Sequence, residues 1–242
     1  MKLDTRVLPD IDALSRAALE ELLSDLRDAI AERGRGAIAL SGGHTPEIMY
    51  ALWASTEKYR SETDWNRVHF FWGDERYVPQ DDPLSNFRMT RETLLSHVPV
   101  PAANIHAAPT SLPTPEQAAE AYDQELRKFF GSAAPAFDVT LLGLGPEGHT
   151  ASLFPDSPAL DEKTRWVVPV RVAATPPNRL TFTLPVLNSS CNTYFLVAGE
   201  SKRPILAALR AEPDSRPSAY PAGRIRPADG RVLWFLDQAA AG

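Results

Sequence analysis

Apolar residues recur along the chain in two rhythms, one typical of amphipathic helices and one typical of buried strands. Residues 10–33 show the helical rhythm, and Gly34 follows as a helix stop. Further helices are predicted at 45–58, 85–95, 115–130, 185–190 and 201–211. Short apolar runs predict strands at 36–40, 68–72, 138–142, 166–170, 180–183, 193–198 and 232–236. Strands and helices therefore alternate over most of the chain.

This alternation is typical of α/β proteins, because a strand, a helix and a further strand form a crossover unit with parallel strands. We therefore predict a mostly parallel central sheet with helices on both faces. No internal repeat, low-complexity tract or long linker interrupts the pattern, so residues 1–242 are predicted to form a single domain. The proline-rich stretch 213–227 is predicted to be an ordered surface loop.

The composition narrows the class of protein. The 242 residues carry a formal net charge of −6, which argues against a nucleic-acid binder, because such proteins need a basic face. No apolar run is long enough for a membrane-spanning helix, which needs about 18 residues or more. The single cysteine, Cys191, cannot form an internal disulfide, and we predict a buried thiol in a reducing compartment.

Three polar loops directly follow predicted strands. They begin at residues 41, 73 and 143, and the second is predicted to extend over 73–84. In open α/β sheets, ligands bind in the crevice beyond the carboxyl ends of the strands. The three loops are therefore expected to contribute to one site.

The first loop has the composition of a phosphate cradle. Gly42 and Gly43 let the backbone approach an anion closely, and the following helix presents free N–H groups with positive partial charge. Ser41 and Thr45 add hydroxyl donors. The loop lacks the motif of a nucleotide P-loop. A glycine-rich turn with Thr45 as the helix N-cap is an equal alternative at this point.

Charged residues accompany the other strand ends. Asp74 and Arg76 follow one predicted strand, where an arginine can neutralise a developing oxyanion. Arg179 precedes the predicted strand 180–183, Lys202 lies at the start of the predicted helix 201–211, and both cations can reach the same crevice. The alternative for each of them is an exposed charge in a solvated turn.

The third loop carries a histidine. Its first six residues match the G-x-G-x-x-G pattern of dinucleotide-binding proteins, but no long helix follows and no acidic residue ends the next strand. A loop that projects Glu147 and His149 is the better interpretation. An ordinary imidazole, with a pKa of about 6.5, is a competent base at neutral pH. The chain lacks a G-x-S-x-G elbow, which favours attack by an activated water.

Together these motifs resemble the 6-phosphogluconolactonase family, within the superfamily that also contains glucosamine-6-phosphate deaminases. The resemblance covers nearly the whole chain from Ser41 onward, and the run G-H-T-A-S-L-F-P at 148–155 is its most specific part. The other motifs occur in family order, as S-G-G-x-T-P at 41–46, G-D-E-R at 73–76, S-N at 85–86, R-L-T at 179–181 and A-G-x-x-K at 198–202.

The resemblance implies a cytosolic, cofactor-free enzyme with a modified Rossmann-like fold. It implies hydrolysis of 6-phospho-D-glucono-1,5-lactone to 6-phosphogluconate, the second step of the oxidative pentose phosphate pathway. His149 would activate water, Arg76 would steady the lactone oxygen or the carboxylate formed, and Asp74 would help to order the site. The residues implied to bind the substrate phosphate are Ser41, Gly42, Gly43, Thr45, Arg179 and Lys202.

Two positions bear on the alternatives. The family usually has Asp two residues before the histidine, where this chain has Glu147, whose longer side chain can still orient the imidazole. The deaminases carry Glu five residues after the histidine, where this chain has Phe154, and a phenyl ring cannot transfer protons. A sugar-phosphate-binding regulator without turnover is the third hypothesis. We expect no metal and no nucleic-acid or membrane partner, and a monomer or weak homodimer.

Overall fold

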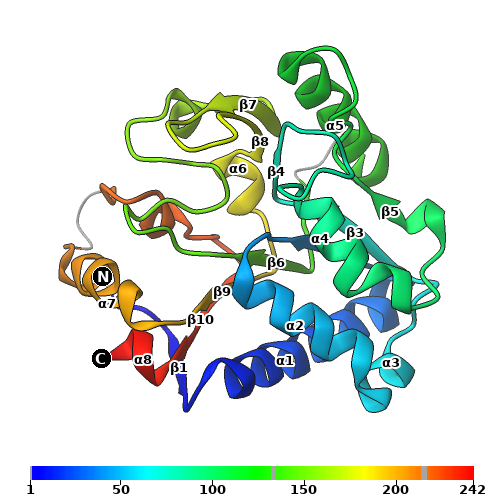
Figure 1. The fold of residues 1–242 in the computed structure, drawn as a ribbon, viewed down its shortest axis with the longest axis horizontal. Helices are drawn as coiled ribbons and strands as arrows, with labels where there is room; N and C mark the ends of the chain where they lie inside the picture. Colours follow the sequence, from blue (N-terminus) through cyan, green and yellow to red (C-terminus); the bar gives the residue numbers. More distant parts are fainter. Residues whose placement is uncertain (1, 132–134, 214–216) are drawn as a thin grey trace.

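The computed structural model describes residues 2–131, 135–213 and 217–242. A seven-stranded sheet crosses its centre, and every pair of neighbouring strands in it is parallel (Figure 1). In spatial order the strands are β1 (Thr5–Leu8), β10 (Arg231–Asp237), β9 (Asn192–Val197), β6 (Val139–Leu142), β2 (Gly36–Leu40), β3 (Val68–Trp72) and β5 (Ile105–His106). Along the sequence, strands follow one another outward from β2 through β3 to β5, and β6 then lies on the other side of β2.

Helices cover both faces of this sheet, which confirms the predicted α/β class. One face packs against α1 (Ile11–Arg33), α2 (His44–Ser55), α3 (Glu57–Glu62) and α4 (Asn86–Thr93). The other packs against α5 (Pro115–Phe130), α6 (Leu184–Leu187), α7 (Arg203–Ala211) and α8 (Gln238–Ala241). None of the described helices is long and apolar enough to cross a membrane.

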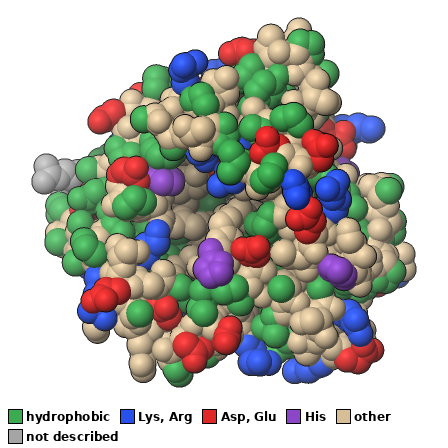
Figure 2. All heavy atoms as spheres, viewed as in Figure 1, with side chains coloured by type: hydrophobic (Ala, Val, Ile, Leu, Met, Phe, Trp, Pro, Cys, Tyr) green, Lys and Arg blue, Asp and Glu red, His purple; other side chains and the backbone are tan. Residues whose placement is uncertain are grey.

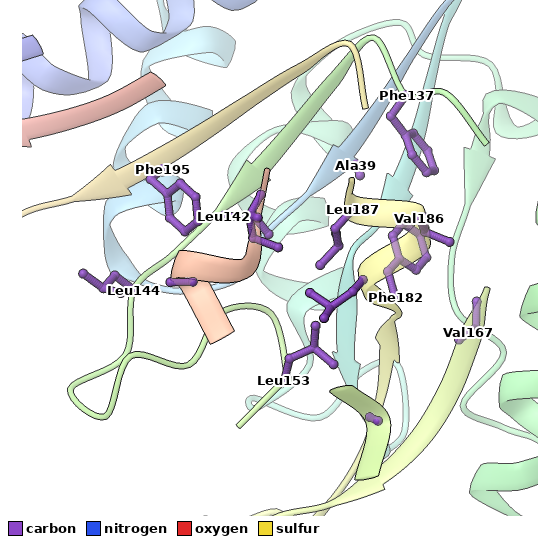
Figure 3. Close-up of a cluster of buried hydrophobic side chains, with 14 of the residues drawn as sticks. Ala39, Phe137, Leu142, Leu144, Leu153, Val167, Phe182, Val186, Leu187 and Phe195 are labelled. Atoms are coloured by element: carbon purple, nitrogen blue, oxygen red, sulfur yellow. The ribbon is translucent and has the colours of Figure 1, made fainter. Parts of the chain in front are cut away.

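Successive residues of each central strand enter opposite cores, as the strand period of two requires. In β2, Ile38 and Leu40 join the core under α1 and α2, whereas Ala37 and Ala39 join the core under α5. Figure 3 shows part of this second core, in which Leu142, Phe182 and side chains of α6 lie close together. Because both faces are buried, the strands read as continuous apolar runs.

A second, antiparallel sheet of three strands lies on the same side of the central sheet as α5. It consists of β4 (Asp74–Arg76), β8 (Asn178–Phe182) and β7 (Val167–Arg171), with β8 in the middle. The prediction of a continuous polar loop over 73–84 was therefore wrong. Three successive charged residues carry no strand pattern, and they form a strand here because β8 supplies the hydrogen-bonding partner.

Other predictions also need correction. The predicted helix 45–58 is two helices, because Thr56 takes an extended conformation between α2 and α3. Cys191 is exposed, since it lies in the turn just before β9. Part of the predicted surface loop is packed inward, with Ser218 and Ala222 buried, while residues 214–216 lie outside the described residues.

A chain of polar side chains links β3, β5 and α5. The Nδ1 of His69 lies 3.1 Å from Nε2 of His106, and the Nδ1 of His106 lies 2.8 Å from a carboxylate oxygen of Glu125. The carboxylate accepts a hydrogen bond, so both imidazoles can remain neutral with His69 as the donor to His106. Burial, together with His106 and Arg35, lowers the pKa of His69 to about 4.

We expect His69 to reduce stability as the pH falls from about 6.5 to about 4. In this window the unfolded chain binds a proton at His69 that the folded chain does not bind, so acid favours unfolding. Glu75 has the opposite effect on stability as the pH falls, because burial raises its pKa to about 7 and the folded chain then binds the proton more readily than the unfolded chain. The measurement is therefore the difference in urea unfolding between the wild type and His69→Phe across this range. Equal pH slopes for the two proteins would contradict the prediction.

Candidate active site

A cavity of about 290 Å³ opens at the carboxyl ends of β9, β6, β2 and β3. This is the edge where the strand order reverses between β2 and β6, the usual ligand position in such sheets. Figure 2 shows a hollow on this face with Lys, Arg and His side chains around it. The predicted site residues that line the cavity are Ser41, Gly42, Gly43, Thr45, Asp74, Arg76, His149, Arg179 and Lys202.

The first wall is the loop between β2 and α2. Gly43 is the N-cap of α2 with a φ of 103°, and no side chain caps the helix in the described residues. Thr45 is therefore not the N-cap, and the backbone N–H groups at this end of α2 remain open to a ligand. The hydroxyl of buried Tyr50 holds the loop by accepting from the N–H of Ser41 and donating to its carbonyl oxygen.

The second wall carries two arginines. Arg76 and Arg179 are directly opposite each other on β4 and β8, and both line the cavity. Their Nε atoms are buried without a hydrogen-bond partner. Burial lowers the pKa of Arg179, which Asp74 opposes and Arg76 reinforces. Two like charges across a strand pair are unfavourable unless an anion balances them, so this wall is suited to a negatively charged ligand.

The third wall follows β9. Lys202 lies at the end of a short turn, and its Nζ donates a hydrogen bond of 2.8 Å to the carbonyl oxygen of Leu144. The turn begins at Gly199, whose N–H is 3.0 Å from both carboxylate oxygens of Asp237 at the end of β10. The cation of Lys202 is thus held beside the loop that follows β6.

That loop presents His149 to the cavity. The Nδ1 of His149 lies 2.8 Å from a carboxylate oxygen of Glu147, and Glu147 itself does not line the cavity. Partial burial opposes ionisation of Glu147, but hydrogen bonds from its own backbone and from His149, with Lys202 nearby, lower its pKa overall. An ionised carboxylate accepts the Nδ1 proton and leaves the lone pair of Nε2 available.

Asp74 connects the arginine wall with the histidine loop. Its carboxylate accepts a hydrogen bond of 2.7 Å from the hydroxyl of Ser152, which is fully buried. Its carbonyl oxygen accepts from the side-chain amide of Asn86, and that amide packs so tightly against Gly42 that a side chain there would collide with it. In the sequence, Ser152 and Asn86 were only members of family motifs, and only the folded chain shows that both bind Asp74.

Glu75 is a further residue whose role was not predicted. Its buried carboxylate accepts from the backbone N–H groups of Arg76, Asn86 and Phe87 and from the hydroxyl of Ser85. Burial nevertheless raises its pKa to about 7. These bonds fasten the first turn of α4 to β4, and thereby place Asn86 at the cavity.

The loop that carries His149 is contacted by two residues of the stretch predicted to be a surface loop, Tyr220 and Ala222. Gly148 has a φ of 78°, and a side chain there would collide with the ring of Tyr220. The carbonyl oxygen of Gly148 accepts a hydrogen bond of 3.0 Å from the N–H of Ala222. No composition signal in 213–227 pointed to this contact.

The cavity brings three cationic side chains and an imidazole together. Arg76, Arg179 and Lys202 face a cavity to which, within the described residues, Asp74 is the single contributing carboxylate. Among the residues that the structure describes, no three His, Cys, Asp or Glu side chains are grouped so that they could bind a metal ion. The site can therefore hold a small anion and activate a water molecule beside it.

Comparisons with known proteins identify the family of the chain. The family model for glucosamine-6-phosphate isomerases and 6-phosphogluconolactonases matches residues 9–234. The 6-phosphogluconolactonase of Synechocystis sp. is 46% identical over 237 residues, which are 97% of this chain and 95% of that protein. The solved 6-phosphogluconolactonase of Thermotoga maritima has a TM-score of 0.83 and 31% identity, covering 98% of this chain and 100% of that one.

A solved monomeric glucosamine-6-phosphate deaminase shares the fold, with a TM-score of 0.79 at 20% identity and coverage of 99% of each chain. The fold alone therefore does not separate the two activities. The family match and the identity to the cyanobacterial relative both extend over almost the whole sequence. The chain belongs to the family of glucosamine-6-phosphate isomerases and 6-phosphogluconolactonases.

Proposed function

We propose that the chain hydrolyses 6-phospho-D-glucono-1,5-lactone to 6-phosphogluconate, the second step of the oxidative pentose phosphate pathway. The names of the two relatives described above support this substrate. The observation that carries the proposal is the position of His149, which has Nδ1 bonded to Glu147 and lines the same cavity as three cationic side chains.

The anion-binding walls hold the substrate in this proposal. The phosphate lies at the open N-terminus of α2, where Ser41, Gly42, Gly43 and Thr45 provide N–H and hydroxyl donors. The side chains that complete the phosphate site are Arg179 and Lys202. Binding energy from this remote group positions the lactone for attack.

His149 supplies the chemical step. Its Nε2 accepts a proton from water, and the water oxygen attacks C1 of the lactone. The bond from C1 to the ring oxygen then breaks, and the imidazolium returns its proton to that oxygen, which leaves as a hydroxyl group. The carboxylic acid so formed ionises to the product carboxylate. General-base catalysis of this kind contributes about 10²- to 10⁴-fold to the rate.

Arg76 and Asp74 have supporting roles. Arg76 stabilises the oxyanion that forms at the carbonyl oxygen and then the product carboxylate, which is worth about 10²- to 10³-fold for one preorganised donor. Asp74 keeps the site ordered through Ser152, and Glu147 holds the tautomer of His149. Asp74 and Arg76 are two residues apart in β4, so one strand fixes the spacing between them.

A coupled assay tests the proposal. Glucose-6-phosphate dehydrogenase generates the lactone, and its disappearance is followed with and without the protein. We expect a large acceleration over spontaneous hydrolysis. Release of ammonia from glucosamine-6-phosphate would instead indicate a deaminase. Calorimetric binding of 6-phosphogluconate without faster lactone loss would indicate the regulator.

We expect Lys202→Ala to raise KM about tenfold or more and to change kcat little, because a hydrogen-bonded charge is worth about 1.5–3 kcal/mol. The measurement is the steady-state rate as a function of lactone concentration. Lys128→Ala is the matched control, since Lys128 is exposed on α5 away from the cavity. A collapse of kcat at constant KM would assign Lys202 to the chemical step instead.

A further inference from the structure

The imidazole of His149 is restrained by more than its hydrogen bond to Glu147. The ring of Phe154 is stacked on it, with 4.0 Å between the ring centroids and 21° between the planes. Gly145 also lies directly against the imidazole, since a Cβ there would be 2.0 Å from its Cε1 and Nδ1 atoms. The ring therefore has a stacked neighbour, a backbone contact and a polar partner.

Phe154 is itself fixed by the residues before it. Leu153 is fully buried and reaches into the core shown in Figure 3. Ser152 is bonded to Asp74 through its hydroxyl and to the hydroxyl of Thr181 through its backbone N–H. The aromatic ring is thus attached to a segment that the three-stranded sheet and the hydrophobic core hold in place, which makes it a stable surface for stacking.

Without such a restraint, the imidazole would be free to turn. The torsion about the bond to the ring is broad for histidine, and the side chain is 25% exposed. A rotated ring would take Nδ1 away from Glu147 and Nε2 away from the reacting water. Misplacement of a catalytic group by about 1 Å can cost about 10²-fold in rate.

We propose that Phe154 is a positioning residue, whose stacking on His149 keeps Nδ1 on Glu147 and Nε2 directed to the cavity. The inference rests on the proposed role of His149 as the general base. It gives Phe154 a function in hydrolysis, in addition to marking the absence of the deaminase carboxylate. Gly145 belongs to the same arrangement, because only a residue without a side chain allows the ring this close.

Kinetic analysis of Phe154→Leu tests the proposal. We expect kcat to fall about 10- to 100-fold while KM stays within about twofold, because the phosphate site is untouched. Phe154→Tyr keeps the ring and should restore most of kcat. Phe129→Leu is the matched control, since Phe129 packs on His69 and His106 outside the cavity, and its kcat should equal that of the wild type.

The tautomer of His149 provides a readout that does not depend on turnover. Nitrogen-15 NMR of the imidazole should show predominantly the Nδ1–H tautomer in the wild type and a mixture in Phe154→Leu. If Phe154→Leu does not fold, Phe154→Met removes the ring with less change in volume and is held to the same expectations. Wild-type kcat in a folded ringless variant, or an unchanged tautomer, would overturn the proposal. Absence of lactone hydrolysis by the wild type would contradict the proposed function. The NMR comparison would still test whether stacking by Phe154 orients His149.

Discussion

The His149→Ala variant is expected to lose about 10²- to 10⁴-fold in kcat while folding normally. The substitution removes the group that takes the proton from water, and Glu147 cannot replace it because it does not line the cavity. The cost in stability should be small. The side chain of His149 is 25% exposed and that of Glu147 is 51% exposed, so no buried charge loses its only partner.

Initial rates on freshly generated lactone and the Tm of the same preparations measure the two parts of this prediction. His97→Ala is the matched control, because His97 is exposed and contacts the carbonyl oxygen of Glu92 outside the cavity. It should retain both the rate and the Tm of the wild type. A near-normal rate for His149→Ala would remove this residue from the mechanism.

The Arg179→Met variant is expected to raise KM by about 10- to 100-fold without a loss of stability. Methionine keeps much of the apolar stem and removes the charge that faces the substrate phosphate. Folding already disfavours this charge, since burial and Arg76 lower the pKa of Arg179 in spite of Asp74. Its removal ends the cost of burying the charge, so the Tm should be equal or higher.

Steady-state kinetics and thermal unfolding test this combination. Inorganic phosphate should raise the Tm of the wild type and have a smaller effect on the variant, because at a given concentration a ligand of the folded state stabilises it more when it binds more tightly. Arg171→Met is the control on the neighbouring strand, where Arg171 is exposed and opposite Asn178. An unchanged KM, or a Tm several degrees lower, would show that Arg179 serves the fold and not the ligand.

The central strands and long helices could be predicted because each carries its own periodic signal. The first helix begins after Asp10, which caps it, and ends at Gly34 in a left-handed conformation, and both signals are local. The edge strands β1 and β5 were not visible, because they are short and owe their order to hydrogen bonds with β10 and β3.

The site could be predicted only as a set of loops. Parallel strands bring their carboxyl ends to one edge of a sheet, so loops after four such strands had to meet. Which side chains face one another was a different question. The opposition of Arg76 and Arg179 depends on the register of an antiparallel sheet that the sequence did not reveal. The contact of Tyr220 with Gly148 joins segments about 70 residues apart, and neither carries a signal for the other.

The sequence by itself determined the class of fold and the chemical groups at the strand ends, because periodicity and short motifs are properties of single segments. Only the tertiary structure decided that β4 is a strand, that Cys191 is exposed and that Phe154 stacks on His149. The strand β4 and the stacking of Phe154 arise where the second sheet and the loop after β6 pack together, whereas Cys191 lies at the other edge of the central sheet, just before β9. Such contacts depend on the whole fold, since a ring or a hydroxyl group finds its partner only after distant segments have met.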